Sequence, residues 1–349
     1  MRVVVTGASG NVGTNVLAAL AARDEVGSIV GISRRKPDIA FPRTTWHVAD
    51  VARDDLTPVL RGADVVIHLA WLIQPSRDER TTYAVNVAGS RRVFAAAARA
   101  GVGALVHASS VGVYARAPKD VRVDERWPAT GIDTSFYSRH KALAERDLDD
   151  VERRHPDLRV VRLRPGLVFS RDAAAEIRRL FLGPLFPGAI VRRSLVAVIP
   201  DVSGLKVQAV HGRDVGRAYA EAALRTDARG AFNIAAEPIV DARLAARVLG
   251  ARTVPVPAAP VRGLASFTWH AHLQPTPPGW LDLALGAPIM STDRAREVLG
   301  FTPAHSATDA LSDLLGGLRD NAGAMTPPLA PGAGGPLRAR EFLTGVGHR

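Results

Sequence analysis

Met1-Arg-Val-Val-Val-Thr-Gly-Ala-Ser-Gly-Asn-Val-Gly13 begins with a short β-branched run that leads into three glycines. An Ala- and Leu-rich segment follows and predicts a helix over about residues 11–22. A strand, a glycine turn and a helix in this order are typical of a dinucleotide site. The turn lets the backbone approach a pyrophosphate, and the helix N-terminus attracts the anion. The glycine spacing is G-x-x-G-x-x-G, and we expect a dinucleotide at this turn.

Further apolar runs alternate with helical patterns along the next hundred residues. The runs cover 28–32, 45–49, 65–69 and 102–108, and a long helical pattern covers 78–100. Strands separated by such helices predict a parallel, doubly wound sheet with right-handed crossovers. Ligands bind at the carboxyl ends of strands in such sheets, where Gly7, Arg34, Asp50, Ala70 and Ser110 all fall. The sequence therefore predicts an α/β fold of the Rossmann type.

Two adjacent arginines, Arg34 and Arg35, follow the second expected strand. An acidic residue at this place would bind the adenosine ribose 2′-hydroxyl, whereas an arginine suits a 2′-phosphate. The pair therefore favours NADP(H) over NAD(H), and NAD(H) is the alternative cofactor.

Tyr137-Ser138-Arg139-His140-Lys141 lies in an expected helix. Residues four apart share one helix face, so the Tyr137 phenol should lie beside the Lys141 ammonium. A nearby cation lowers the pKa of a phenol from its usual value near ~10, which would let the pair act as a general acid/base. The alternative is two surface residues on an amphipathic helix.

Composition restricts the other classes of site. The chain has no cysteine, which excludes disulfides and thiolate metal sites, and no His or carboxylate pair has metal-ligand spacing, so we expect no metal. The N-terminus has no signal-peptide pattern, and no apolar run approaches the ~20 residues that a membrane span needs. We therefore expect a cytoplasmic protein without a membrane partner.

The formal net charge of +11 comes mainly from arginine, because only four of the 45 basic residues are lysines. The arginines are scattered, without the clustering and interleaved aromatics of a nucleic-acid patch. We interpret the charge as coding bias in an Ala- and Arg-rich bacterial proteome, and expect no nucleic-acid partner.

Together these motifs resemble the extended short-chain dehydrogenase/reductase family, also called the NAD-dependent epimerase/dehydratase family, over about residues 1–320. The segments that carry the resemblance are Thr6–Gly13, Asp50-Val51, His68-Leu-Ala70, Asn86-Val-Ala-Gly89, Ser109–Tyr114, Tyr137–Lys141, Arg164–Val168, Val210-His211, Asp214-Val215 and Gly230–Ile234.

The resemblance implies a role for each matching catalytic position. Tyr137 would be the general acid/base, and Lys141 would lower its pKa and bind the nicotinamide ribose. Ser110 would hold the reacting oxygen, and Asn86 would support the helix and an active-site water. The glycine turn, the strand ends and the resemblance together imply cofactor contacts at Gly7, Gly10, Asn11, Val12, Gly13, Arg34, Arg35, Asp50, Val51, Leu69, Ala70, Trp71, Ser109, Tyr137, Lys141, Pro165, Gly166 and Val168.

One departure bears on the substrate. Nucleotide-sugar epimerases of the family usually carry an arginine where this chain has Val207, although Arg171, Arg192 or Arg193 could supply an anion clamp. We expect an NAD(P)-dependent oxidoreductase that acts on a small secondary alcohol or ketone. The alternatives are a nucleotide-sugar 4-epimerase with tightly bound NAD, and a non-catalytic dinucleotide sensor or nucleic-acid-binding member.

The expected organisation is a dinucleotide-binding domain over 1–171, its sheet completed by about 206–235. Segments 172–205 and 236–322 would form a smaller substrate-binding lobe, with Trp71, Tyr83, Phe169 and Trp269 as candidate pocket residues. We expect a flexible tail over 323–349, within which 337–343 could form a short helix. The resemblance also suggests a homodimer formed through the helices at 78–100 and 134–155.

Overall fold

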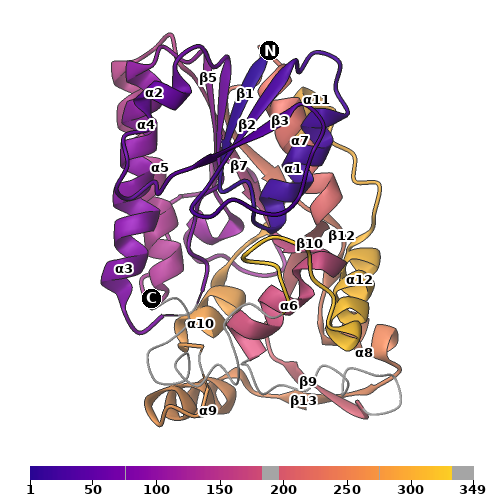
Figure 1. Ribbon diagram of the computed structural model, residues 1–349. Coiled ribbons are helices and arrows are strands. Elements are labelled where there is room, and N and C mark those ends of the chain that lie inside the picture. Colours follow the sequence, from indigo (N-terminus) through magenta and orange to yellow (C-terminus); the bar gives the residue numbers. More distant parts are fainter. Residues whose placement is uncertain (75, 183–195, 275, 332–349) are drawn as a thin grey trace.

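A seven-stranded parallel sheet forms the centre of the computed structural model, which describes residues 1–74, 76–182, 196–274 and 276–331 (Figure 1). Its spatial order is β11 (Gly230–Ile234), β7 (Arg159–Pro165), β5 (Ala104–Ala108), β4 (Val65–His68), β1 (Arg2–Thr6), β2 (Ser28–Ser33) and β3 (Thr44–Val48). Every neighbouring pair is parallel. The strand order reverses beside β1, where doubly wound sheets bind their ligands. The predicted Rossmann-type fold is confirmed.

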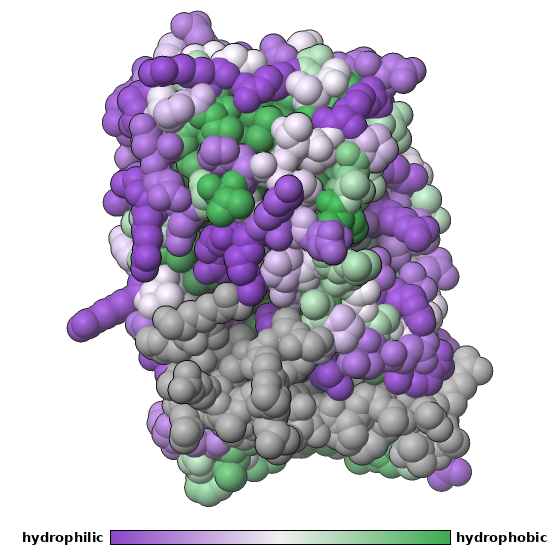
Figure 2. All heavy atoms as spheres, in the orientation of Figure 1, coloured by the Kyte–Doolittle hydropathy of each residue, from purple (hydrophilic) through white to green (hydrophobic). Residues whose placement is uncertain are grey.

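Helices cover both faces of this sheet (Figure 1). One face carries α1 (Asn11–Ala21), α7 (Gly212–Leu224) and α11 (Asp293–Leu299), and the other carries α2 (Thr57–Leu60), α4 (Ser90–Arg99) and α5 (Phe136–Arg154). Side chains alternate along β1, so Val3 and Val5 pack in one core with Leu17, whereas Val4 packs in the other with Phe94. Much of the outer surface in Figure 2 is hydrophilic, as expected for amphipathic helices.

The helix expected over 78–100 is present but not uniform. It starts as α3 (Glu79–Tyr83), passes through a π-helical turn (Ala84–Gly89) and continues as α4. The Asp78 carboxylate caps its start by accepting from the N–H groups of Arg80 and Thr81 at 3.0 and 3.3 Å. Such π-helical turns are frequent at functional sites, and this one contains Asn86.

A smaller lobe lies beyond the carboxyl edge of the central sheet (Figure 1). It contains a sheet in the order β12 (Ala236–Val240), β10 (Val207–His211) and β8 (Leu167–Phe169), and a parallel pair of β9 (Val198–Val202) with β13 (Arg252–Val256). A two-residue ladder pairs β6 (Arg122–Val123) with β14 (Ile289–Met290). Helices α6 (Ala174–Ile177), α8 (Ala242–Leu249), α9 (Ala258–His270), α10 (Gly279–Gly286) and α12 (Ala307–Asp320) complete the described part.

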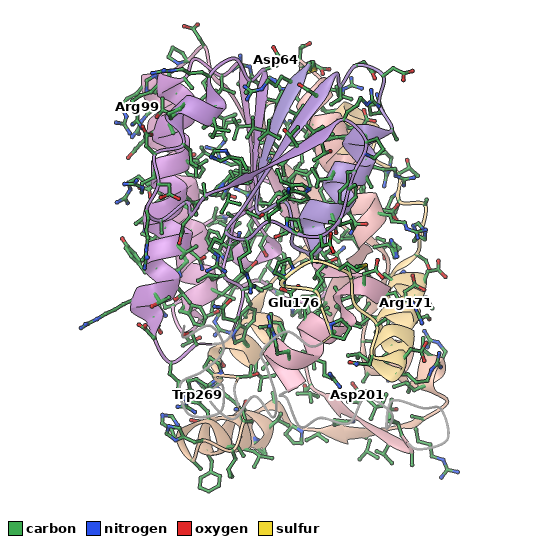
Figure 3. The ribbon with its side chains drawn as sticks, viewed as in Figure 1. Asp64, Arg99, Arg171, Glu176, Asp201 and Trp269 are labelled. Carbon is green, nitrogen blue, oxygen red and sulfur yellow. The ribbon has the colours of Figure 1, made fainter. Side chains whose placement is uncertain are left out.

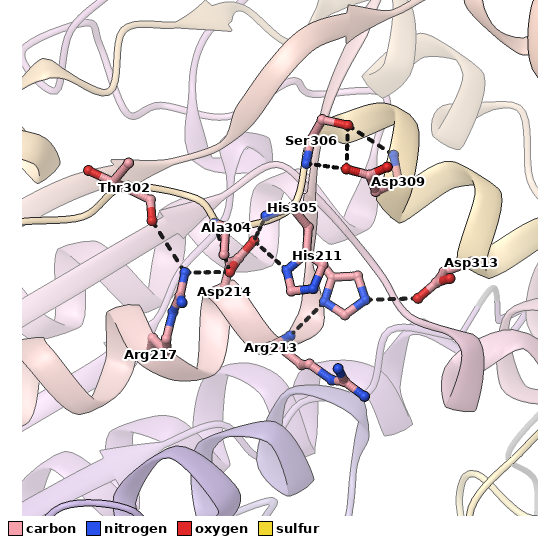
Figure 4. Close-up of polar contacts among 10 residues, drawn as sticks. All are labelled: His211, Arg213, Asp214, Arg217, Thr302, Ala304, His305, Ser306, Asp309 and Asp313. Atoms are coloured by element: carbon pink, nitrogen blue, oxygen red, sulfur yellow. Dashed lines mark hydrogen bonds and ion pairs between the residues drawn. The ribbon is translucent and has the colours of Figure 1, made fainter.

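A polar cluster around Asp214 joins α7 to the segment before α12 (Figure 4). The fully buried Asp214 carboxylate accepts from the backbone N–H groups of Ala304 and His305 at 3.2 and 3.0 Å and from Arg217 at 2.6 Å. The imidazoles of His211 and His305 stack at 4.1 Å. His211 therefore serves a packing role here.

The beginning of the expected tail is packed rather than free. Leu329 is fully buried, and its carbonyl accepts from the N–H of Ala324 at 3.2 Å. The expectation of a flexible tail is therefore wrong for residues 323–331, because an apolar side chain anchors them. Residues 332–349, with the helix considered at 337–343, lie outside the described residues, as do Arg192 and Arg193. Within the described ranges, no helix is long and apolar enough to cross a membrane.

Candidate active site

Helix α5 carries the central side chains of the site. It begins at Phe136, after Ser135, whose hydroxyl caps the helix by accepting from the N–H of Ser138 at 3.4 Å. Tyr137, Lys141 and Glu145 follow at intervals of four residues and are all buried on its inner face. The structure therefore brings Tyr137 and Lys141 together on one buried face rather than on the surface.

Tyr137 lies between two indole rings and beside Ser110. Its ring centroid is 5.0 Å from that of Trp280 and 6.2 Å from that of Trp71. Burial raises the pKa of Tyr137 to about 12, and a side-chain hydrogen bond with Ser110 only partly opposes the rise. The expected lowering of this pKa is therefore not found, because burial outweighs the Ser110 hydrogen bond.

The Lys141 ammonium contacts Ala108 and Trp71 more closely than it contacts Tyr137, its expected partner. Its Nζ donates to the carbonyl oxygen of Ala108 at 2.6 Å and lies 3.4 Å from the ring centroid of Trp71, but 5.7 Å from that of Tyr137. Burial lowers the pKa of Lys141 well below its ordinary value, and the nearby Glu145 carboxylate opposes this. Lys141 thus anchors the end of β5, next to Ser109 and Ser110.

Glu145 and Arg164 form a buried ion pair behind this site. The Arg164 Nε and Nη2 donate to the two Glu145 oxygens at 2.9 and 2.5 Å, and the Ser109 hydroxyl donates to Glu145 at 2.5 Å. Burial alone would raise the pKa of Glu145, but Arg164 and Ser109 hold it below the ordinary value. Sequence reasoning missed Glu145, although its position four residues after Lys141 placed it on the same face. The hydroxyl of Ser109, which was expected at the cofactor, donates to Glu145.

Asn86 holds the segment that follows β4. Its amide accepts from the N–H of Leu72 at 2.7 Å and donates to the Leu72 carbonyl at 2.9 Å. Its side chain is fully buried, so both of these bonds are protected from water. Asn86 thus fixes the backbone directly after Trp71.

The glycine turn fits a dinucleotide pyrophosphate. Gly7 has a φ of 70°, and a Cβ there would lie 2.6 Å from the N atom of Ala70. A Cβ at Gly13 would meet the Gly7 oxygen at 2.4 Å, whereas at Gly10 the nearest atom would be 3.5 Å away. Gly10 therefore faces open space at the N-terminus of α1, which has neither a side-chain cap nor an acidic residue in its first turn. This cradle has the geometry and the positive dipole that a bound phosphate needs.

The other expected cofactor residues lie at the same edge. Arg34 and Arg35 follow β2 and are exposed. The Asn11 side chain reaches the end of β8, since its Nδ2 donates to the Val168 carbonyl at 3.4 Å and its Oδ1 accepts from Ser170 at 2.8 Å. Of the remaining positions, Val12 lies in the first turn of α1, and Pro165 is the last residue of β7. The others follow strands: Asp50, Val51, Leu69 and Gly166.

The candidate pocket aromatics have different surroundings. Phe169 packs against α12 within the smaller lobe, and Tyr83 is 41% exposed with its ring against His140. Trp269 lines a cavity together with Trp280. Trp280 was not among the pocket residues predicted from the sequence. Within the described ranges, no group of three or more His, Cys, Asp or Glu side chains is placed to hold a metal ion.

Known proteins resemble this chain in sequence and in fold. A family model described as "NAD dependent epimerase/dehydratase family" matches residues 3–235. An uncharacterized protein of Mycobacterium tuberculosis is 28% identical over 326 residues, which cover 93% of this chain and 31% of that protein. The chain thus spans about a third of the length of this mycobacterial relative.

Two further proteins are similar over much of the chain. The L-arabinose 1-dehydrogenase (NAD(P)(+)) of Haloferax volcanii is 30% identical over 237 residues, which are 61% of this chain and 89% of that enzyme. The crystal structure of the Thermus thermophilus UDP-glucose 4-epimerase complex with NAD has a TM-score of 0.68 at 21% identity. The match covers 91% of this chain and 99% of that chain, and it shows a shared fold.

Proposed function

This chain belongs to the NAD-dependent epimerase/dehydratase family, a family of enzymes, and we propose that it transfers a hydride between NAD(P)(H) and a secondary alcohol or ketone. The observation that carries the proposal is the gathering of Ser110, Tyr137 and Lys141 at the carboxyl edge of the sheet. The uncapped N-terminus of α1 at the same edge supports the dinucleotide, as does the relative named L-arabinose 1-dehydrogenase (NAD(P)(+)).

In the proposed reaction, Tyr137 transfers the proton and Ser110 donates a hydrogen bond to the reacting oxygen. A bound nicotinamide dinucleotide supplies the hydride for reduction or accepts it in oxidation. The Ser110 Oγ accepts from the N–H of Gly112 at 3.0 Å and shares a hydrogen bond with Tyr137, and a reacting oxygen placed between the two hydroxyls would accept the Ser110 proton in its stead. Tyr137 gives its phenolic proton to that oxygen as the carbonyl is reduced, and takes it back in the reverse direction.

Lys141 is proposed to bind the ribose beside the nicotinamide. Its Nζ donates to the carbonyl oxygen of Ala108, the last residue of β5. Because Ser109 and Ser110 follow directly, the position of Lys141 is coupled to theirs. The Glu145 carboxylate favours the ammonium form of Lys141. Asn86 contributes by fixing the backbone next to Trp71, whose ring contacts the Lys141 Nζ.

The test of the proposal is cofactor retention and turnover with the purified chain. We expect no dinucleotide to co-purify, and we expect NADPH oxidation when a carbonyl substrate is added. NAD released only on denaturation, without net redox, would replace this proposal by the nucleotide-sugar 4-epimerase alternative. Binding of neither NADP(H) nor NAD(H) would overturn the enzymatic proposal.

Substitution of Gly10 by alanine should weaken the binding of NADPH and NADH alike. The backbone of Gly10 has a φ of −81°, which alanine adopts without strain, so the free energy of unfolding should change by less than about 1 kcal/mol. The added methyl group would occupy the open cradle, and we expect at least a tenfold loss of affinity, or about 1.4 kcal/mol, in a fluorescence titration. Gly263→Ala is the matched control, since its Cβ meets nothing within 4 Å. Equal affinities of Gly10→Ala and wild type would contradict the placement.

Arg34→Ala should discriminate between the two cofactors. We propose that Arg34 and Arg35 bind the 2′-phosphate of NADP(H), and a charge-assisted hydrogen bond contributes about 1.5–3 kcal/mol. Titration should therefore show NADPH affinity falling by at least about tenfold, with NADH affinity nearly unchanged. Lys36→Ala, an exposed cation two residues away, is the control. An equal loss for both dinucleotides would show that Arg34 does not recognise the 2′-phosphate.

A further inference from the structure

The surroundings of Tyr137 are unusually apolar for a site that would bind a sugar nucleotide. The Trp280 ring lies over the Tyr137 ring at 35° between planes, and Phe136 and Phe181 meet Trp280 edge-on at 6.2 and 5.0 Å. Besides the indole of Trp71, the remaining members of this cluster are aliphatic: Ile132, Leu283, Ala287 and Val111. These side chains offer a substrate apolar area and ring faces rather than hydrogen-bonding partners.

A cavity of about 300 Å³ borders Trp280. Its walls combine the rings of Phe136, Trp269 and Trp280 with the polar residues Ser76, Arg77, Glu79, Thr134 and Ser135, and Figure 3 shows Trp269 on the α9 side of the smaller lobe. Trp280 lines this cavity and also contacts the Tyr137 ring, and a volume of about 300 Å³ is at the lower end of small-molecule sites.

The charges around the cavity do not suit a diphosphate. Among the described lining residues the one cation is Arg77, whose guanidinium lies 3.6 Å from the Trp269 ring centroid and donates to the Trp269 carbonyl at 2.5 Å. Glu79 also lines the cavity, and its carboxylate is already paired with Arg139 at 2.8 Å. Nearby, Arg262 of α9 is already bound to both oxygens of Asp282 in α10 at 2.7 and 2.9 Å.

Two hydrogen-bond donors beside Tyr137 lack a partner. The indole nitrogens of Trp71 and Trp280 are buried and have no acceptor among the described residues. A buried unpaired donor is unfavourable, so an oxygen of a bound ligand would satisfy it. Both donors are neutral, which suits a carbonyl or hydroxyl oxygen.

We propose that the substrate is an uncharged, ring-bearing, largely apolar ketone or secondary alcohol, and that Trp280 is the residue that sets this preference. The inference rests on the proposed function, because it names the substrate class of the same site. It also separates this chain from the epimerase of similar fold, which is named for a UDP-sugar. In β10, Gln208 follows Val207, and its amide group binds the backbone of Met290 at 3.0 and 2.7 Å. Gln208 is therefore already occupied and does not offer a polar contact to a diphosphate.

The test compares equilibrium binding of four probes to the full chain by calorimetry. The probes are cyclohexanone, β-tetralone, a tetrahydrophenanthrenone and UDP-glucose. We expect affinity to rise with the number of rings, and UDP-glucose to bind more weakly than the bicyclic ketone. Tighter binding of UDP-glucose than of every ketone, or no dependence on ring number, would overturn the inference. If the ketones bind in the expected order but NADPH is not oxidised, the substrate class stands and the proposed function fails.

Variants of Trp280 test the residue itself. Trp280→Ala should weaken β-tetralone binding by about tenfold, whereas Trp280→Phe, which keeps an apolar ring, should retain most of the affinity. Trp280→Phe also keeps the test valid if Trp280→Ala fails to fold. Trp127→Phe, in a separate core cluster, is the control and should bind like wild type. Unchanged ketone affinity in a folded Trp280→Ala would remove Trp280 from the site.

Discussion

Tyr137→Phe should lower kcat by about 10²- to 10⁴-fold, which is the usual contribution of a positioned general acid or base. The substitution removes one hydroxyl and keeps the ring that packs between Trp71 and Trp280. We therefore expect the fold and the affinity for NADPH to remain as in wild type. Loss of turnover with retained dinucleotide binding is the combination that separates an enzyme from a dinucleotide sensor.

The measurement is kcat with the carbonyl substrate, together with a dinucleotide titration of the same preparation. Tyr83→Phe is the matched control, because Tyr83 is 41% exposed and its ring contacts His140 rather than the site. We expect this control to retain wild-type kcat. A Tyr137→Phe variant that keeps more than about a tenth of kcat would show that another group transfers the proton.

The pH dependence follows from the buried phenol. Burial raises the pKa of Tyr137 to about 12, so the phenol is protonated at neutral pH and ready to donate. Reduction needs the protonated form, which is present below the pKa and lost as the pH rises through it. Reduction should therefore vary little across the neutral range, and oxidation, which needs the phenolate, should accelerate as the pH rises.

The fold could be predicted from the sequence because its signals are local. The expected strands agree within two residues with β2, β3, β4 and β5, since each is an apolar run that ends where a turn begins. The glycine turn was recognisable for the same reason, because its glycines all lie within the first thirteen residues. The structure explains two of them, since a Cβ at Gly7 or Gly13 would clash with the backbone. The spacing of Tyr137 and Lys141 likewise required only the period of a helix.

The surroundings of those residues could not be predicted, because distant segments supply them. The pKa of Tyr137 rises through burial, and Trp280, far along the chain, covers its ring. Lys141 lies over Trp71, which reaches it from the end of β4 and not from the same helix. Leu329 anchors a segment whose Pro- and Gly-rich composition indicated a tail. The pKa of Tyr137, the partner of Lys141 and the packing of Leu329 thus all depend on tertiary contacts, which a local sequence pattern does not specify.

Glu145→Gln should destabilise the protein by about 3–5 kcal/mol, the cost of leaving a buried charge without its partner. The side chains of Glu145 and Arg164 are each 6% exposed, and two hydrogen bonds of 2.9 and 2.5 Å join them. Glutamine keeps the shape but removes the charge that compensates the Arg164 guanidinium. The measurement is the free energy of unfolding by urea denaturation, monitored by far-ultraviolet circular dichroism.

Two further measurements check the prediction for Glu145→Gln: the pH dependence of stability, and a substitution in an exposed ion pair. The pKa of Glu145 lies below its ordinary value, so the ionised carboxylate stabilises the fold above about pH 4.3, the usual glutamate pKa, and this contribution is lost as the pH falls through the lowered pKa. The difference between wild type and Glu145→Gln should therefore shrink in acid. Asp124→Asn breaks an exposed pair with Arg126 and should cost at most about 1 kcal/mol. A cost below about 1 kcal/mol for Glu145→Gln would mean that the buried pair is not what holds this region.

The double variant Glu145→Leu with Arg164→Met shows how much of the loss is unpaired charge. Removing both charges avoids the burial of either alone, so the double variant should be more stable than Glu145→Gln. It should remain less stable than wild type, because the pair also satisfies other groups. Arg164 donates to the Tyr114 hydroxyl at 3.0 Å, and Ser109 depends on Glu145 for its acceptor. Because Ser109 adjoins Ser110, the double variant should also lower kcat even where it folds, which ties this ion pair to the geometry of the site.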